Sequence, residues 1–163
     1  MKNFTSENKP VHILVNNTGG PKGGDIYKAD ISEFENTFRN HLICNQIMVQ
    51  AVVDGMKSEK YGRIINIIST SVKQPLDNLG VSNTIRGAVA NWAKTLANEL
   101  GQFNVTVNNV LPGATLTSRL EAIIEKESML NNKSISEITS QMLNTIPLNR
   151  FASPNEIANV VAF

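Results

Sequence analysis

A serine and an arginine stand four residues apart in the stretch 81–100, VSNTIRGAVANWAKTLANEL. Residues at this spacing lie one helical turn apart, so Ser82 and Arg86 are predicted to share one face of a helix. A guanidinium, with a pKa above about 12, cannot relay protons, but it can hydrogen-bond and supply positive charge. Arg86 is therefore either a structural cation beside a bound group or a participant in turnover. Ser82 is a weak acid, and a serine near a helix start is commonly a cap.

Three other side chains could handle a proton or an anion. His41 lies in a mostly apolar helical stretch and is either an acid, base or relay that titrates near neutral pH, or a packed residue. Lys73 could bind an anionic substrate or protonate an alkoxide, and the alternative is a solvated loop lysine. Tyr27 stays a remote candidate for an acid. No metal site is expected.

Three short apolar runs are predicted to be the strands that position these residues. They are rich in β-branched and aliphatic side chains, as the buried strands of parallel sheets are. The runs are 11–15 (VHILV), 63–69 (RIINIIS) and 105–111 (VTVNNVL). The first is followed by the turn NNTGG and the third by Pro112-Gly113.

Helical spacing of apolar residues fills the intervals between and after these runs. The predicted helices cover 31–60, 81–100, two short segments within 117–143 that are separated near residue 131, and a last helix from 154. Ser153, Pro154 and Glu156 have the types and spacing of a capping box with proline at the first helical position. The last helix is therefore predicted to begin at this point.

The order β-α-β-α-β-α-α predicts an α/β fold, a doubly wound parallel sheet with helices on both faces. We expect residues 1–163 to form one partial domain. In such sheets, ligands bind beyond the carboxyl ends of the strands. The segments 16–20, 69–73 and 112–117 all follow strands, so they are predicted to converge on one crevice.

Composition excludes several classes of protein. Apolar residues make up 41% and charged residues 18% of the 163 residues, which is typical of a globular protein. The net charge of +1 indicates neither a nucleic-acid nor a membrane partner. No secretory signal or spanning segment is visible, which favours a cytoplasmic protein. The single cysteine, Cys44, is predicted to be a buried, inert thiol.

These elements and motifs together resemble the short-chain dehydrogenase/reductase family over residues 11–163, in an atypical branch with S-N-x-x-R. The fold this implies is Rossmann-like, and the chain matches only part of it. The matching motifs are the turn NNTG at 16–19 (N-N-A-G in the family), GRIINIIS at 62–69, the layout L-A-x-E-L at 96–100, VNNVLPGATLT at 107–117 and IPLNRFASPNEIA at 146–158.

The resemblance implies site residues position by position. The family's catalytic serine falls on Ser69, whose hydroxyl is expected to hydrogen-bond the substrate oxygen. The tyrosine and lysine positions fall on Ser82 and Arg86, and the helix asparagine falls on His41. The residues implied for the nicotinamide cofactor, NAD or NADP, are Asn17, Thr18, Gly19, Arg86, Pro112, Gly113, Thr115 and Thr117.

The implied function is an NAD(P)-dependent oxidoreductase that acts on a small carbonyl or alcohol substrate, such as a 3-oxoacyl thioester. A homodimer or homotetramer is expected to assemble through the helices at 31–60 and 81–101. Two alternatives stay open: a non-catalytic nucleotide-binding homologue, and an incomplete gene product that lacks the family's N-terminal Gly-rich turn and its extreme C-terminus.

Overall fold

The computed structural model describes residues 10–163, and the chain separates into two compact units. The first unit ends at Leu111, and the second runs from Pro112 to Phe163. The first unit carries the sheet. The second contains helices and loops, and an isolated β-bridge pairs Thr115 with Ala152. The expected single domain over 1–163 stays a prediction.

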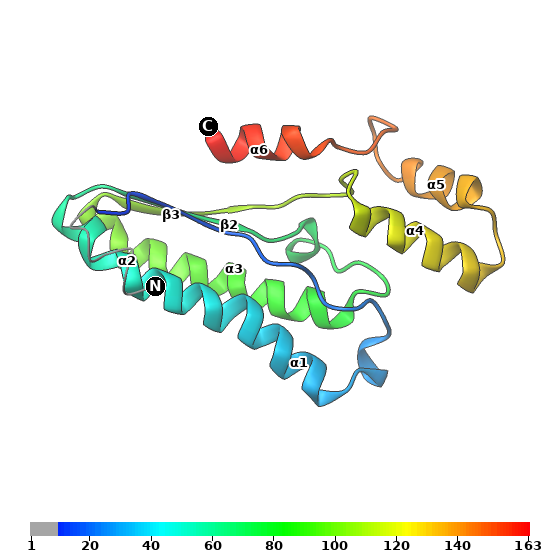
Figure 1. Ribbon diagram of the computed structural model, residues 1–163, viewed down its shortest axis with the longest axis horizontal. Coiled ribbons are helices and arrows are strands. Elements are labelled where there is room, and N and C mark those ends of the chain that lie inside the picture. Colours follow the sequence, from blue (N-terminus) through cyan, green and yellow to red (C-terminus); the bar gives the residue numbers. More distant parts are fainter. Residues whose placement is uncertain (1–9) are drawn as a thin grey trace. The chain divides into compact units, whose positions relative to one another are not determined.

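Three parallel strands form the sheet of the first unit, in the order β1-β2-β3 (Figure 1). Their bounds are Ile13–Asn16 for β1, Gly62–Ile67 for β2 and Val105–Val110 for β3. Each lies within two residues of its predicted bounds. The predicted parallel α/β sheet is therefore confirmed in this unit.

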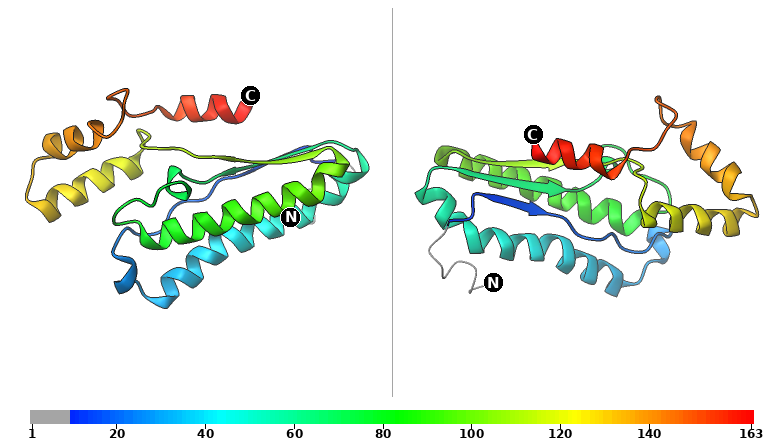
Figure 2. Two further views of the ribbon diagram at one scale, coloured as in Figure 1. Left: turned by 180° about the vertical axis from the view of Figure 1, so that it is seen from behind. Right: turned by 45° about the horizontal axis from the view of Figure 1, so that its top comes forward.

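The helices between these strands lie along one face of the sheet (Figures 1 and 2). They are α1 (Ile31–Phe38), a π-helical turn (Arg39–Ile43), α2 (Cys44–Ser58) and α3 (Gly80–Leu100). Within this unit the helices cover one face of the sheet (Figures 1 and 2), and helices on the other face stay a prediction. Because the strands follow one another in sheet order, two crossovers of the same hand place both helices on the same side.

The main core lies between this sheet face and helices α2 and α3. Met56 and Ile64 are completely buried at its centre, where Gly62 allows close packing. A Cβ added at Gly62 would lie only 2.7 Å from the Met56 sulfur. The buried members are Leu14, Val49, Val52, Met56, Ile64, Ala93, Leu100, Val105 and Val107.

The other face of β1 carries exposed apolar side chains. Ile13 is 57% and Val15 is 43% exposed, whereas Leu14 between them is buried. Successive side chains of a strand point to opposite faces, so this alternation marks the side of β1 away from α2 and α3.

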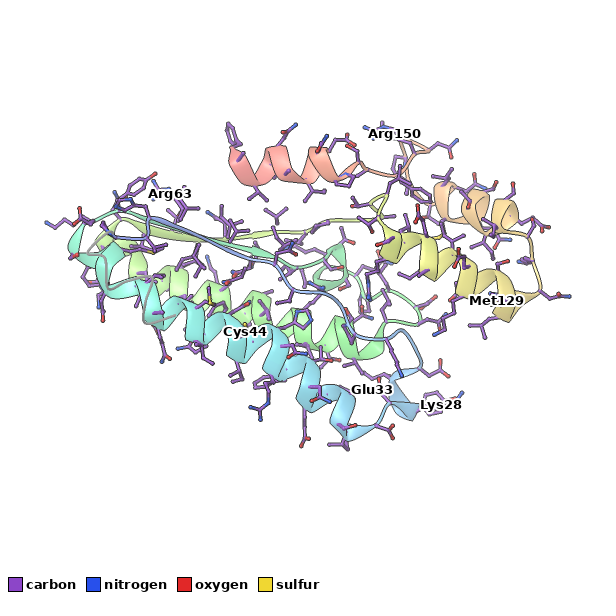
Figure 3. All side chains as sticks on the ribbon, viewed as in Figure 1. Lys28, Glu33, Cys44, Arg63, Met129 and Arg150 are labelled. Atoms are coloured by element: carbon purple, nitrogen blue, oxygen red, sulfur yellow. The ribbon has the colours of Figure 1, made fainter. Side chains whose placement is uncertain are left out.

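Cys44 is exposed, so the prediction of a buried thiol is wrong. It is the first residue of α2 and is labelled in Figure 3. The side of α2 that faces the core is marked by Val49, Val52 and Met56, which are buried together with Asn45. Apolar neighbours in the sequence do not decide on which side of a helix a residue lies, and Cys44 falls outside the buried side.

The second unit contains α4 (Ser118–Asn131), α5 (Ile135–Leu143) and α6 (Pro154–Ala162). Helix α4 ends at Asn131, and its C-cap Asn132 has a left-handed φ of 49°, which confirms the predicted break. Side chains from α4, α5 and the segment before α6 form its small core, namely Leu120, Ile124, Ile138 and Phe151.

Capping boxes begin both later helices of this unit. Ser134 with Glu137 caps α5, and Ser153 with Glu156 caps α6, so the predicted start of α6 is confirmed. Arg150, labelled in Figure 3, binds both carboxylate oxygens of Glu156 at 2.7 and 2.9 Å. These hydrogen bonds, with that from the Ser153 backbone, lower the pKa of Glu156 to about 2.

Candidate active site

Three asparagines form a ladder across the carboxyl ends of the strands, in which Asn16 and Asn66 are buried and Asn109 is half-buried. Asn16, Asn66 and Asn109 are paired in register. The amide of Asn16 donates to the Asn66 oxygen at 2.9 Å, and the amide of Asn66 donates to the Asn109 oxygen at 3.0 Å. Asn66 is 0% exposed. Buried amides must be paired, so this ladder favours one register and keeps the turns that follow β1 and β2 at the same level.

Ser69 lies just beyond the end of β2 and begins a 3-10 turn at Thr70–Val72. Its backbone is extended, and its Oγ accepts a hydrogen bond from the Ser71 backbone N–H at 3.1 Å. The residue is half-buried. A serine hydroxyl can donate its proton while it accepts a hydrogen bond, so Ser69 can donate to a substrate oxygen from this position.

The Ser82–Arg86 pair reaches from helix α3 to the same end of β2. The Arg86 Nη1 donates to the carbonyl oxygens of Ile67 and Ile68 at 3.1 and 2.9 Å. Its Nε donates to the Ser82 Oγ at 3.3 Å. The structure thus brings Arg86 to the two residues that precede Ser69.

Ser82 is not the cap of its helix. Helix α3 begins at Gly80 after Leu79, and Ser82 is its third residue. The side chain is 6% exposed, and its hydroxyl accepts from the Arg86 side chain. The helix begins at Gly80, two residues before Ser82 and one before Val81, the first apolar position of its predicted face. A serine that resembles a cap in the sequence therefore becomes an interior residue.

His41 lies in the π-helical turn between α1 and α2 and is 4% exposed. Its Nδ1 is 2.6 Å from the Thr18 Oγ1, which follows β1. The direction of this hydrogen bond depends on the protonation of the ring. The Thr18 hydroxyl donates to Nδ1 when the neutral ring carries its proton on Nε2, and Nδ1–H donates to Thr18 when both ring nitrogens are protonated, the form that can act as an acid. Single π-helical turns are frequent at functional sites.

The remaining residues of the turn after β1 leave room for a ligand. Asn17 and Gly19 are exposed, and a Cβ added at Gly19 would meet no atom within 4 Å. Thr18, expected to contact the cofactor, uses its hydroxyl to bind His41. The contact of this turn with a nicotinamide cofactor stays a prediction.

Four further residues of the predicted cofactor site lie in the second unit. Pro112, Gly113, Thr115 and Thr117 belong to the loop before α4. The Thr115 hydroxyl donates to the Gly113 carbonyl at 3.1 Å, and the Thr117 hydroxyl caps α4 by accepting from the Leu120 N–H at 3.4 Å. Both hydroxyls thus shape this loop, and their contact with a cofactor stays a prediction.

Neither Lys73 nor Tyr27 has a buried position. Lys73 is exposed after the 3-10 turn, in keeping with a solvated loop lysine. Tyr27 is 79% exposed, and the Lys28 ammonium lies 5.0 Å from its ring centroid. Within residues 10–163, no cluster of histidine, cysteine and acidic side chains could hold a metal ion, and no helix is long and apolar enough to cross a membrane.

Comparison with known proteins identifies the class. A model of the short chain dehydrogenase family matches residues 1–128, more than half of the chain. The chain therefore belongs to the short chain dehydrogenase family, and the resemblance predicted from its motifs is confirmed.

Its relatives include bacterial reductases. The chain is 32% identical over 155 residues to the 3-oxoacyl-[acyl-carrier-protein] reductase FabG of Aquifex aeolicus, covering 94% of this chain and 57% of FabG. It is 28% identical over 151 residues to the NADPH-dependent reductase BacG of Bacillus subtilis, covering 93% and 58%. The chain therefore spans about three fifths of the length of these relatives.

Solved structures confirm the Rossmann-like α/β fold. The crystal structure of YwfH, an NADPH-dependent reductase involved in bacilysin biosynthesis, matches with a TM-score of 0.91 at 25% identity. An actinorhodin polyketide ketoreductase with NADPH matches with a TM-score of 0.90 at 28% identity. Each match covers 99% of this chain and 62% of the other chain.

Proposed function

We propose that this protein is an NAD(P)-dependent oxidoreductase that interconverts a carbonyl and an alcohol on a small molecule, such as a 3-oxoacyl group. Membership of the family supports this proposal, as do relatives named as a 3-oxoacyl reductase and an NADPH-dependent reductase. The observation that carries it is the Ser69 hydroxyl, which is oriented by the Ser71 N–H and keeps its proton for a substrate oxygen.

NAD or NADP would supply the hydride chemistry when bound. Ser69 hydrogen-bonds the reacting oxygen and stabilises the negative charge that develops on it during carbonyl reduction. Arg86 adds a fixed positive charge near the end of β2, where it binds the carbonyls of Ile67 and Ile68. The proton that the oxygen must gain is held by another group, because a guanidinium does not release one.

We assign that proton to His41. It is the only catalytic candidate among Ser69, Ser82, Arg86 and His41 whose side-chain type titrates between pH 5 and 8. Thr18 orients its ring through the 2.6 Å contact. In this proposal Ser82 contributes only by holding Arg86. The cofactor contacts are the predicted ones: Asn17, Thr18, Gly19, Arg86, Pro112, Gly113, Thr115 and Thr117.

A homodimer or homotetramer in the cytoplasm is part of the same proposal. The outer side of the helices between β1 and β2 exposes apolar residues, among them Ile43 and Ile47. Burial of such a patch against a second copy would remove its apolar surface from water.

A second candidate is a nucleotide-binding homologue without hydride transfer. The observation that favours it is the buried Ser82 hydroxyl, which stands at the family's tyrosine position and is engaged by Arg86. No acid occupies that position, so catalysis depends on His41 or another group.

The test is NADH and NADPH oxidation by the purified protein with a panel of ketones and 3-oxoacyl thioesters. We expect turnover with one of the two cofactors, and a loss of about 100-fold in kcat for Ser69→Ala, the size of one oxyanion donor. Ser58→Ala, which removes an exposed hydroxyl at the end of α2, is the matched control. Cofactor binding without turnover would support the second candidate, and no cofactor binding would contradict both.

A further inference from the structure

The guanidinium of Arg86 makes contacts that a catalytic role does not require. One nitrogen, Nη1, binds the carbonyl oxygens of two consecutive residues, Ile67 and Ile68. In a regular strand, successive carbonyls point to opposite edges, so a nitrogen that reaches both marks the place where the extended chain ends. Strand β2 does end at Ile67, and the Ile68 N–H still bonds the Val110 carbonyl at 2.9 Å.

Ser69 is the next residue, and it is held from both sides. On its N-terminal side, Arg86 binds the two preceding carbonyls. On its C-terminal side, its own Oγ accepts a hydrogen bond from the Ser71 N–H and caps the 3-10 turn. The direction of the Ser69 side chain therefore depends on how the chain leaves β2, and Arg86 fixes that exit.

Ser82 completes the arrangement. It lies one turn before Arg86 on α3 and accepts the Nε–H at 3.3 Å, so that Nη1 is directed toward the strand. The guanidinium is a planar group with N–H donors in fixed directions, which lets one side chain serve Ser82 and the two carbonyls at the same time. A lysine ammonium is a point charge on a flexible stem and cannot reproduce that geometry.

We propose that Arg86 is a positioning residue for Ser69: held by Ser82, it fixes the end of β2 and thereby the direction of the Ser69 hydroxyl. The importance of that hydroxyl for carbonyl chemistry rests on the proposed function, but the positioning itself does not. It can be tested without cofactor or substrate.

The test is native-state hydrogen exchange of the Ser71 amide, which reports the hydrogen bond to the Ser69 Oγ. The matched control is the Leu120 amide, capped by the Thr117 hydroxyl in the second unit. We expect Arg86→Met to lower protection of the Ser71 amide at least tenfold and to leave the Leu120 amide within twofold. Arg86→Lys should restore part of the protection, and Ser69→Ala should lower it as Arg86→Met does.

The double variant distinguishes positioning from general stabilisation. In the Ser69→Ala background, Arg86→Met should change Ser71 protection less than threefold, because the bond that Arg86 maintains is already absent. Unchanged protection of Ser71 in Arg86→Met would overturn the proposal. Equal losses at Ser71 and Leu120 would also overturn it, because Arg86 would then stabilise the protein as a whole.

An activity arm separates this inference from the proposed function. Where turnover is found, Arg86→Met should lower kcat at least tenfold and change the KM for the carbonyl substrate less than threefold, and it should add little to Ser69→Ala. If no turnover is found but the exchange results hold, the positioning inference stands and the proposed function fails.

Discussion

The Thr18–His41 and Ser82–Arg86 pairs differ in how the chain assembles them. Thr18 and His41 come from different elements 23 residues apart, a turn after β1 and an irregular turn between two helices. Ser82 and Arg86 are neighbours on one helix and reach a strand end together. The first pair exists only because the tertiary fold brings its members together, whereas the second is local.

The pairs also differ in chemistry. The first contains an imidazole, which can gain and lose a proton near neutral pH, and the second contains only groups that keep their protons. We propose that Thr18–His41 transfers the proton and that Ser82–Arg86 provides geometry and positive charge. The family resemblance places the proton donor and the cation on one face of helix α3. In the proposed function the cation, Arg86, stays on α3, whereas the proton donor, His41, lies in the π-helical turn between α1 and α2.

Removal of Asn66, the central asparagine of the ladder, should have the largest effect on stability, because the ladder fixes the strand ends near both pairs. Asn66→Ala leaves the buried Asn16 amide and the half-buried Asn109 oxygen without their partner in the ladder. We expect a loss of about 2–4 kcal/mol in the free energy of unfolding, measured with urea. Asn108→Ala, at an exposed position of β3, should change it by less than about 0.5 kcal/mol. Equal effects would contradict a role of the ladder.

Ser82→Tyr should break the second pair and leave the first intact. The tyrosine ring must enter a place that is 6% exposed and displaces the contact with Arg86. We expect a loss of about 1–3 kcal/mol of stability, and no gain of NAD(P)H oxidation even when Arg86→Lys is added. The control is Ser58→Tyr at an exposed helix end. A gain of activity in the double variant would show that helix α3 keeps the family's catalytic geometry.

Thr18→Val should break the first pair alone. Valine has nearly the shape of threonine but no hydroxyl, so the His41 Nδ1 loses its partner. We expect a stability loss of about 1 kcal/mol, and Thr18→Ser should recover most of it. In a double-mutant cycle with His41→Gln, the coupling energy should be about 0.5–1.5 kcal/mol. A coupling near zero would mean that the contact contributes nothing.

The smallest effect on stability is expected at the exposed pair Arg150–Glu156, with which the effects at the two other pairs can be compared. The carboxylate of Glu156 has a lowered pKa of about 2, so its contribution to stability is complete above the ordinary value of 4.5. It is lost as the pH falls from 4.5 through 2. Glu156→Gln should remove this part of the pH dependence in thermal unfolding, and an unchanged dependence would contradict it.

The sequence predicted those features that depend on local patterns. Apolar periodicity located the strands and helices, and the capping box of Ser153 and Glu156 marked the start of α6 correctly. The family resemblance placed Ser69 at a strand end, and the structure agrees. These signals succeed because helix and strand periods and capping hydrogen bonds involve residues that are close in sequence.

The sequence did not predict the contacts between elements. Each of the three strands has an asparagine near its carboxyl end, but only the register makes Asn16, Asn66 and Asn109 partners. The Thr18–His41 contact depends in addition on the π-helical turn, which shifts the helix face and has no simple sequence signal. The predictions of a cap at Ser82 and of a buried Cys44 were wrong. A cap depends on the residue at which the helix begins, and burial depends on the side of the helix on which a residue lies.

The pH dependence of kcat in His41→Gln shows whether His41 holds the transferred proton. Glutamine keeps a polar side chain of similar size but does not titrate. The account predicts that the wild-type protein shows an ionisation between pH 5 and 8 and that His41→Gln lacks it. The same ionisation in both proteins would contradict the account and direct the search for the proton donor to another residue.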